Sequence, residues 1–199
     1  ITSLTAMAEE EFSKLKVDEE EEEEAEEEAE EDPRITQLYA AADKSTPEAF
    51  AALVEQVGTA NAIVYGGMCT DGPTARAHFI VTAILDADDQ SVQESVEERK
   101  ALLKATVAAG GERSGVCMMA AIESFTLNLE DKEKRDENVA AFDKVLQTIW
   151  EYEIVGEDDM RAWQADERAA RLLRVTTQGA RSLRERGEVF LDWLEHGEE

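Results

Sequence analysis

The sequence is poor in cysteine, in basic residues and in long apolar runs, and each shortage argues against a class of protein. Only two cysteines occur in 199 residues, Cys69 and Cys117, so we expect buried thiols in a reducing compartment rather than a disulfide framework. No apolar run approaches the ~20 residues of a membrane span, and no signal peptide is visible. We therefore expect a cytoplasmic protein without a membrane anchor. The first residue, Ile1, is not methionine, which suggests a piece of a longer protein.

The shortage of basic residues gives the chain an extreme charge. Its 47 acidic residues outnumber 20 basic ones, for a net charge of −27. Such a surface repels the phosphates of nucleic acids and anionic lipids, so direct sequence-specific binding of nucleic acid is not expected. Apolar residues still make up 43% of the chain, enough for a folded core. The composition therefore favours a folded domain with basic proteins as partners.

About half of this charge lies at the start of the chain. Residues 18–32 contain 13 acids and no base, and residues 1–32 contain 16 acids against two lysines. A block of this kind cannot bury enough apolar surface to offset the entropy lost on ordering. We predict an acidic disordered linker over residues 1–33, with Pro33 at the boundary, and a folded domain over residues 34–199.

From Arg34 onward, apolar residues recur at helical spacing. The segment 112–129 is apolar on most sides and should be the central helix. Residues 79–82 could instead form a strand, because they include β-branched side chains. The predicted helices cover 47–57 (opened by Thr46 as N-cap), 60–69, 74–85, 91–109, 112–129, about 132–152, a segment that begins at 157, and about 173–196.

Roughly nine helices with short connections, and no convincing pair of strands, indicate an all-α fold. Helices joined by short loops pack as antiparallel neighbours, so an α-solenoid of helix pairs is the architecture that we predict.

Catalytic and metal-binding motifs are not apparent. His78 and His196 are far apart, and neither has a cysteine at ligand spacing. The pair Gly110-Gly111 lacks the lysine of a phosphate-binding loop and is interpreted as a helix stop. Gly66-Gly67 is interpreted as a tight contact between helices. We predict no catalytic residue, no metal site and no cofactor.

Two segments near the end of the chain, 150–163 and 189–195, interleave aromatic residues with acids. On a helix, Glu188, Asp192, Glu195 and Glu199 would share one face, while Phe190, Trp193 and Leu194 would share another. Such an acidic ridge attracts lysine-rich segments. An ordinary amphipathic helix with a solvated acidic face has the same spacing, so both interpretations stay open.

The tryptophans and arginines of the same region are explained by structural roles, in the core and in ion pairs. Trp163 and Trp193 are more typical of a core than of a contact surface. Seven arginines lie between Arg161 and Arg186, and structural ion pairs with neighbouring acids explain them better than a binding patch.

The segments Trp-Glu-Tyr-Glu-Ile-Val-Gly-Glu-Asp-Asp-Met-Arg-Ala-Trp (150–163) and Phe-Leu-Asp-Trp-Leu-Glu (190–195) resemble two motifs of a known family. This is the two-tryptophan HEAT domain that closes translation initiation factor 5, the epsilon subunit of initiation factor 2B and relatives. The resemblance covers about residues 34–199, and Leu-Val-Glu-Gln-Val-Gly (53–58) is more similar to the factor 5 branch. It implies a stack of HEAT-like helix pairs.

The resemblance also implies a scaffold that is not an enzyme. Such a scaffold binds the lysine-rich tail of the beta subunit of initiation factor 2, with initiation factors 1 and 3, in the pre-initiation complex on the small ribosomal subunit. Nothing in the sequence matches the GTPase-activating arginine or the zinc ribbon of factor 5. The partner-binding residues that the resemblance implies are Glu151, Tyr152, Glu153, Glu157, Asp158, Asp159, Trp163, Phe190, Asp192, Trp193, Glu195, Glu198 and Glu199. The helical spacing adds Glu188.

Two other functions stay open. One is the guanine-nucleotide exchange domain of the initiation factor 2B epsilon subunit. The other is a generic acidic chaperone for basic proteins, which would rely mainly on residues 18–32.

Overall fold

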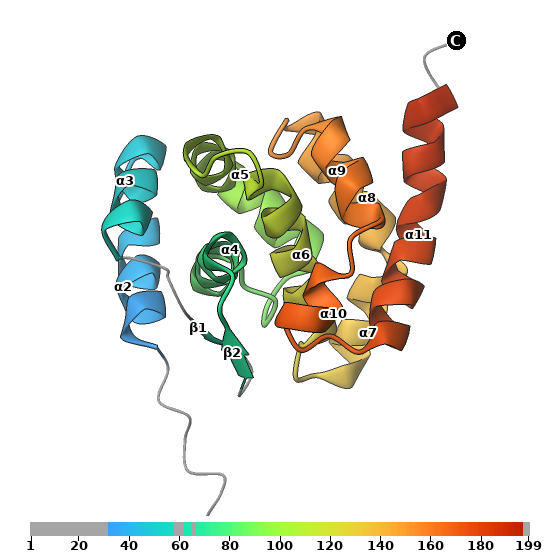
Figure 1. Cartoon of the computed structure of the whole chain (residues 1–199), viewed down its shortest axis with the longest axis horizontal. Helices are drawn as coiled ribbons and strands as arrows, with labels where there is room; N and C mark the ends of the chain where they lie inside the picture. Colours follow the sequence, from blue (N-terminus) through green and yellow to red (C-terminus); the bar gives the residue numbers. More distant parts are fainter. Residues whose placement is uncertain (1–31, 58–61, 65–66, 197–199) are drawn as a thin grey trace, which may run out of the picture. The chain divides into compact units, whose positions relative to one another are not determined.

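The computed structural model describes residues 32–57, 62–64 and 67–196, and over these ranges the protein is almost entirely helical (Figure 1). These ranges contain ten helices and one pair of short strands, which confirms the predicted all-α class. The predicted acidic linker, residues 1–33, lies outside these ranges except for its last two residues. No helix within them is long and apolar enough to cross a membrane.

The elements follow one another with short connections. The helices are α2 (Pro33–Ala42), α3 (Pro47–Val57), α4 (Gly72–Ile84), α5 (Val92–Ala109), α6 (Ser114–Leu127), α7 (Lys132–Ala140), α8 (Phe142–Glu151), α9 (Glu157–Gln164), α10 (Arg168–Leu172) and α11 (Thr177–His196). The strands are β1 (Ala62–Val64) and β2 (Gly67–Cys69).

Side-chain caps fix where several helices begin. The predicted N-cap Thr46 accepts a hydrogen bond from the backbone N–H of Ala49 through its hydroxyl, at 3.3 Å. Ser91 and Glu94 form a reciprocal capping box at the start of α5, and the Asp131 carboxylate caps α7. Each cap satisfies N–H groups that have no partner inside the helix, which stabilises the helix by about 1 kcal/mol. The predicted helix stop is confirmed at Gly110, which is the C-cap of α5.

The helices pack in two rows that run side by side. One row contains α2, α4, α6 and α9, and the other contains α3, α5, α8 and α11, with each helix contacting the next in its row. Figure 1 shows this progression from the blue pair α2–α3 to the red α11. The arrangement is a HEAT-like stack of helix pairs, as predicted.

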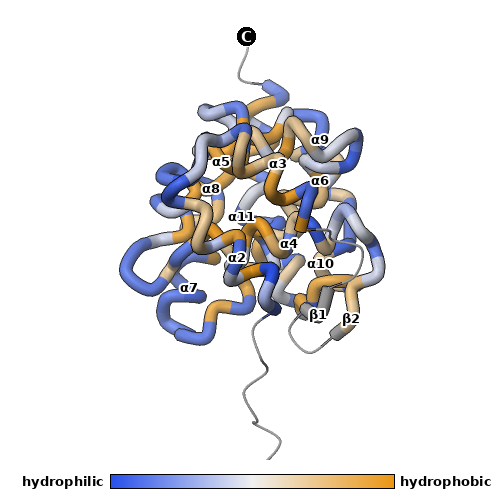
Figure 2. The backbone as a smooth tube through the Cα atoms, turned by 90° about the vertical axis from the view of Figure 1, so that its left-hand side faces the viewer, coloured by the Kyte–Doolittle hydropathy of each residue, from blue (hydrophilic) through white to orange (hydrophobic). Residues whose placement is uncertain are grey.

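Helix α6 lies at the centre of this stack. Every residue from Ser114 to Ser124 is buried, and the helix packs against α4, α5, α7, α9, α10 and α11. Figure 2 shows hydrophobic stretches gathered in the interior and a largely hydrophilic α7 at the periphery. The prediction that 112–129 forms the central helix is confirmed, because a helix that is apolar on all sides must be surrounded.

The predicted helix over 60–69 is wrong. Residues 62–64 and 67–69 form an antiparallel strand pair, with Ala62 opposite Cys69 and Val64 opposite Gly67. The β-branched Ile63 and Val64 followed by two glycines are a hairpin sequence, and this local chemistry outweighed the apolar character that suggested a helix. The interpretation of Gly66-Gly67 as a helix contact is also wrong for Gly67, which belongs to β2. The alternative strand at 79–82 is wrong too, since these residues lie inside α4.

The single helix predicted over 132–152 is divided at Ala141. Its backbone N–H donates to the carbonyls of both Glu137 and Val139, which ends α7 before α8 begins. The buried Asn138 side chain accepts a hydrogen bond from the Val92 N–H at 2.8 Å and so attaches α7 to the start of α5. This long-range contact sets the direction of α7, so the periodicity of residues 132–152 alone did not reveal the break.

The last predicted helix, 173–196, begins later, at Thr177, and is preceded by the short α10. Leu173 and Val175 are buried in the connection, while Arg174 between them has a φ of +57°. The reversed backbone at Arg174 interrupts what the apolar spacing presents as one helix.

Four of the seven arginines form the ion pairs that the sequence indicates. Arg168 binds Asp71 at 3.2 Å and Asp166 at 2.9 Å, and so attaches α10 to the start of α4. Arg161, Arg171 and Arg184 also contact carboxylates, while Arg174, Arg181 and Arg186 have no ion pair among the described residues.

Candidate partner-binding surface

The two aromatic–acidic segments meet in the structure through Arg161. Its guanidinium lies 2.7 Å from the Glu157 carboxylate, on the same helix, and 3.3 Å from the Glu195 carboxylate on α11. The fold therefore brings together acids that are 38 residues apart in the sequence. These contacts make α9 and the C-terminal half of α11 one continuous surface.

The beginning of the first segment faces α5. The Tyr152 hydroxyl donates to the Glu97 carboxylate at 2.7 Å, and the Lys100 ammonium lies 4.1 Å from the centre of the Tyr152 ring. Glu153 pairs with Lys104 at 2.8 Å. The hydrogen bond to Glu97 raises the pKa of Tyr152, and that from Lys104 lowers the pKa of Glu153. Both predicted partner-binding residues are thus already engaged by their own chain.

The acids that follow differ in how freely they face solvent. Glu151, Glu157 and Asp158 are exposed. Asp159 is half-buried against Gly115, where an added Cβ would lie 2.2 Å from the Asp159 carboxylate. Burial, and to a lesser extent the charge of Asp158, raise the pKa of Asp159. Asp159 therefore helps to seat α9 on α6, and its neighbours are better placed to meet a partner.

Helix α11 presents the predicted acidic ridge. Glu188, Asp192 and Glu195 are exposed on it, while Glu198 and Glu199 lie outside the described residues. The opposite side of the helix packs on the core through Leu183, Gly187, Leu191 and Leu194. The predicted apolar face is confirmed for Leu194, which is buried, and for Phe190, which is half-buried against the core. It is wrong for Trp193, because Leu183, Leu191 and Leu194 set the buried side of the helix.

Three aromatic side chains gather beside this ridge. The Trp150 ring, at the end of α8, meets the edge of Trp193 at 5.7 Å between centroids, and Phe190 stacks on Trp193 at 5.9 Å. Trp193 is 53% exposed and Trp150 36%. The prediction that Trp193 belongs to the core is therefore wrong. We call Trp150, Phe190 and Trp193 the aromatic cluster.

The aromatic cluster borders a groove of about 530 Å³ between α8 and α11. Asp143, Gln147, Glu185 and the 75%-exposed Val189 are among the residues that line it. Exposed aromatic and aliphatic groups with carboxylates nearby are the features of a protein interaction site.

Trp163 is placed quite differently, since it is completely buried. Its indole N–H donates to the Glu123 carboxylate at 2.7 Å, and the Arg184 guanidinium binds the same oxygen at 3.1 Å. Burial outweighs these two contacts and raises the pKa of Glu123. The prediction of a core position is confirmed for Trp163, and its implied role as a partner contact is wrong because the ring does not reach the surface.

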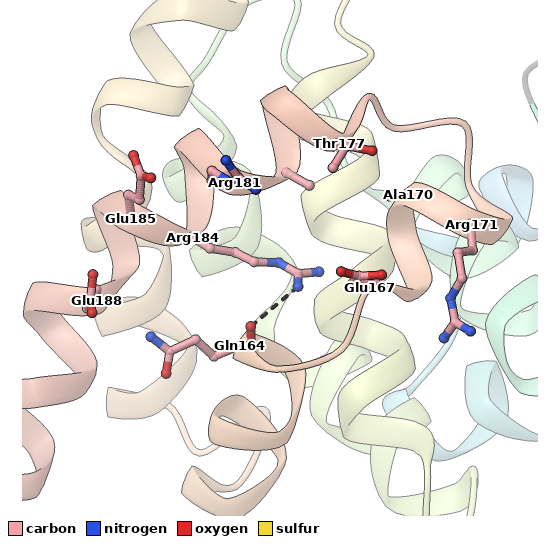
Figure 3. A pocket seen from close by; sticks show the side chains of 10 residues that line it. Gln164, Glu167, Ala170, Arg171, Thr177, Arg181, Arg184, Glu185 and Glu188 are labelled. Atoms are coloured by element: carbon pink, nitrogen blue, oxygen red, sulfur yellow. Dashed lines mark hydrogen bonds between the residues drawn. The ribbon is translucent and has the colours of Figure 1, made fainter.

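A second groove, of about 390 Å³, lies between α9, α10 and α11. Three arginines and three glutamates line it, among them Arg184 and the predicted site residue Glu188. Figure 3 shows Arg184 extending from α11 to the backbone carbonyl of Gln164, to which it donates a hydrogen bond at 3.3 Å. Because the charges balance, this groove has no strong preference for a ligand of either sign.

The described residues contain no group of three or more histidine, cysteine or carboxylate side chains that could hold a metal ion. His78, one of the two histidines, is buried in α4, and burial lowers its pKa to about 4. Its ring therefore stays neutral at physiological pH.

Comparison with known proteins gave one match, over the segment that forms this surface. Residues 114–199, which contain α6 to α11, match the family model W2, described as eIF4-gamma/eIF5/eIF2-epsilon. Over this segment, which is 86 of the 199 residues, the chain is similar to the W2 family. Neither the curated proteins nor the solved structures gave a match. The description of the matching model names translation initiation factors.

Within the matched segment, sequence reasoning missed residues that complete the surface. Trp150 and Val189 are exposed beside Trp193, and Arg161 joins the two acidic segments. Trp150 lies inside the quoted segment, and the only signal for its exposure was the polar Asp143 and Gln147, seven and three residues before it on the same helix.

Proposed function

We propose that the chain is a protein-binding scaffold of translation initiation, and not an enzyme. It holds lysine-rich segments of other initiation factors: the tail of the beta subunit of initiation factor 2, and initiation factors 1 and 3. This assembly forms in the cytoplasm, within the pre-initiation complex. The observation that carries the proposal is the exposed acidic ridge on α11, which lies beside the aromatic cluster in the segment that is similar to the W2 family.

Charge and exposure both support a basic partner. Glu188 and Asp192 are exposed and have no ion pair among the described residues, so their carboxylates are available. A lysine-rich segment would be steered to them over the Debye length, about 8 Å at physiological ionic strength. The aromatic cluster adds apolar contacts and cation–π sites for lysine or arginine side chains.

The test is a titration of a lysine-rich peptide against the protein and a double charge reversal, Glu188→Lys with Asp192→Lys. Both side chains are exposed, so the variant should keep its melting temperature while its affinity falls at least about tenfold. Raising the salt concentration from low to physiological should weaken binding of the unchanged protein steeply.

The matched control is Glu133→Lys with Glu137→Lys on α7. These two glutamates are also exposed, four residues apart on one helix, and without an ion pair in the described part of the chain. The control changes the net charge equally and should bind the peptide nearly as the unchanged protein does. Equal losses in both variants would show that only overall charge matters, as a generic acidic chaperone would require.

A second candidate function is nucleotide exchange, because the family description includes the epsilon subunit. It predicts faster release of GDP from initiation factor 2 when the chain is added. A scaffold leaves the release rate unchanged, so the same protein preparation separates the two functions.

A further inference from the structure

A third groove, of about 700 Å³, lies at the opposite end of α11 from the acidic ridge. It is formed where the end of α6, helix α7, the α10–α11 connection and the first turns of α11 come together. Three cations line it and only one carboxylate, that of Asp136. We call it the basic groove, and its cations are Lys132, Arg135 and Arg174.

The arrangement of charges on α7 is specific to this groove. Lys132, Arg135 and Val139 recur at intervals of three and four and line the groove, whereas the exposed Glu133 and Glu137 do not. Helix α7 has three acids and three bases, and the side that lines the groove carries two of the bases and one acid, Asp136.

The three cations have no carboxylate partner within the part of the chain that the structure describes. Arg135 donates to the backbone carbonyl of Leu129 at 3.1 Å, and neither Lys132, Arg135 nor Arg174 has an ion pair among the described residues. In a chain with 47 acids, a carboxylate partner for each would be easy to supply. Positive charge that is gathered in a groove and left unpaired indicates a negatively charged ligand.

The backbone also directs Arg174 into this position. Its φ of +57° lies in the left-handed region, which only glycine and asparagine adopt readily. The residues on both sides are buried, and the Ser124 hydroxyl donates to the Leu173 carbonyl at 2.9 Å, which holds the connection in place. Arg174 is therefore presented to the groove by a loop whose flanking residues are held in the core.

The start of α11 adds further positive potential. Thr176 caps the helix, accepting from the Gly179 N–H at 3.1 Å through its hydroxyl and from the Ala180 N–H through its carbonyl. The N–H groups of Thr177 and Gln178 are left without a partner among the described residues, at the positive end of a 20-residue helix. Such groups favour carboxylate or phosphate oxygens.

We propose that the basic groove is a second binding site of the domain, and that its ligand is an acidic peptide segment of a partner protein. The site is independent of the acidic ridge, so one α11 helix would hold a basic segment near its C-terminal end and an acidic one at its N-terminal end. A long nucleic acid fits less well, because its continuous charge would extend beyond the groove over a surface that is acidic elsewhere.

The experiment titrates the full chain with a dye-labelled peptide of alternating glutamate and glycine, and separately with a single-stranded RNA of the same net charge. The groove variant is Lys132→Gln with Arg174→Asn, since asparagine tolerates the left-handed backbone at position 174. The control, Lys44→Gln with Lys144→Gln, removes the same charge from two exposed lysines that do not line the groove.

We expect the groove variant to bind the acidic peptide at least about fivefold more weakly, and the control to bind it within about twofold of the unchanged protein. Equal affinities for groove variant and control would overturn the proposal, as would tighter binding of the RNA than of the peptide. Binding of the lysine-rich peptide should be unaffected by the groove variant. Retention of this binding shows that the variant is folded and keeps failure here distinct from failure of the scaffold function.

Discussion

Trp163 and Trp193 belong to the two aromatic–acidic segments, yet one is fully buried and the other is 53% exposed. Trp163 lies against Phe142 at 6.0 Å and hydrogen-bonds to Glu123 inside the stack. Trp193 lies on the outer side of α11 with Trp150 and Phe190. A tryptophan among acidic residues thus serves the core in one segment and the surface in the other.

The cause of the difference is what each helix packs against. Helix α9 contacts the central α6, so Trp163 must enter the core, and a buried carboxylate is present to accept its indole N–H. Helix α11 is the last in its row, and only its Leu183–Leu191–Leu194 side has a neighbouring layer. A helix at the end of a stack leaves one side uncovered, and Trp193 is on that side.

The largest effect is expected for Trp163→Ala. Loss of a fully buried large aromatic should destabilise the domain by about 3–5 kcal/mol, whereas Trp193→Ala should cost roughly 1 kcal/mol, the value of an exposed aromatic contact. Chemical denaturation of both variants, followed by circular dichroism, measures the difference. Equal destabilisation would mean that the two tryptophans are not distinguished by burial.

For affinity toward the lysine-rich peptide, we expect Trp193, and not Trp163, to be the tryptophan that matters more. Trp193→Ala should weaken binding of the lysine-rich peptide about tenfold, because the aromatic cluster loses its most exposed ring. The fold should be retained. Isothermal titration of the folded variant measures this. A control in the same cluster, Trp193→Phe, should recover most of the affinity, since an aromatic face remains. Unchanged affinity in Trp193→Ala would show that charge alone holds the partner.

A smaller effect should appear in the pH dependence of stability around Trp163. The pKa of Glu123 is raised above its ordinary value of 4.5 by burial, so the folded state binds its proton more tightly than the unfolded state. This carboxyl therefore contributes stability that is fully present below pH 4.5 and is lost as the pH rises through the folded-state pKa. Glu123→Gln removes the titration, so its stability relative to the unchanged protein should increase over that window. A difference that is constant with pH would contradict the raised pKa.

The smallest effect on binding is expected at Tyr152 and Glu153. Both face α5 and are engaged by Glu97 and Lys104, so Tyr152→Phe with Glu153→Gln should alter peptide affinity by less than about twofold. The same titration measures it. A loss as large as that of Trp193→Ala would extend the partner surface along α5 and weaken the contrast between the two segments.

Much of the fold followed from local signals. Helices α3, α5 and α6 lie close to their predicted bounds, because Thr46, Ser91 and the Gly110-Gly111 pair mark ends by chemistry that acts within a few residues. The errors fell where distant contacts decide. The break at Ala141 accompanies the Asn138–Val92 hydrogen bond, and the start of α11 depends on Arg174 in a loop held by Ser124.

The sequence by itself determined the helical class, the acidic surplus, the central position of α6 and the acidic face of α11, because these follow from composition and from periods of three and four residues. Only the tertiary structure decided which tryptophan is buried, that Arg161 joins Glu157 to Glu195, and that Lys132 and Arg174 meet in one groove. Periodicity shows which residues share a face of one helix, but it does not show which faces find a neighbour in the stack.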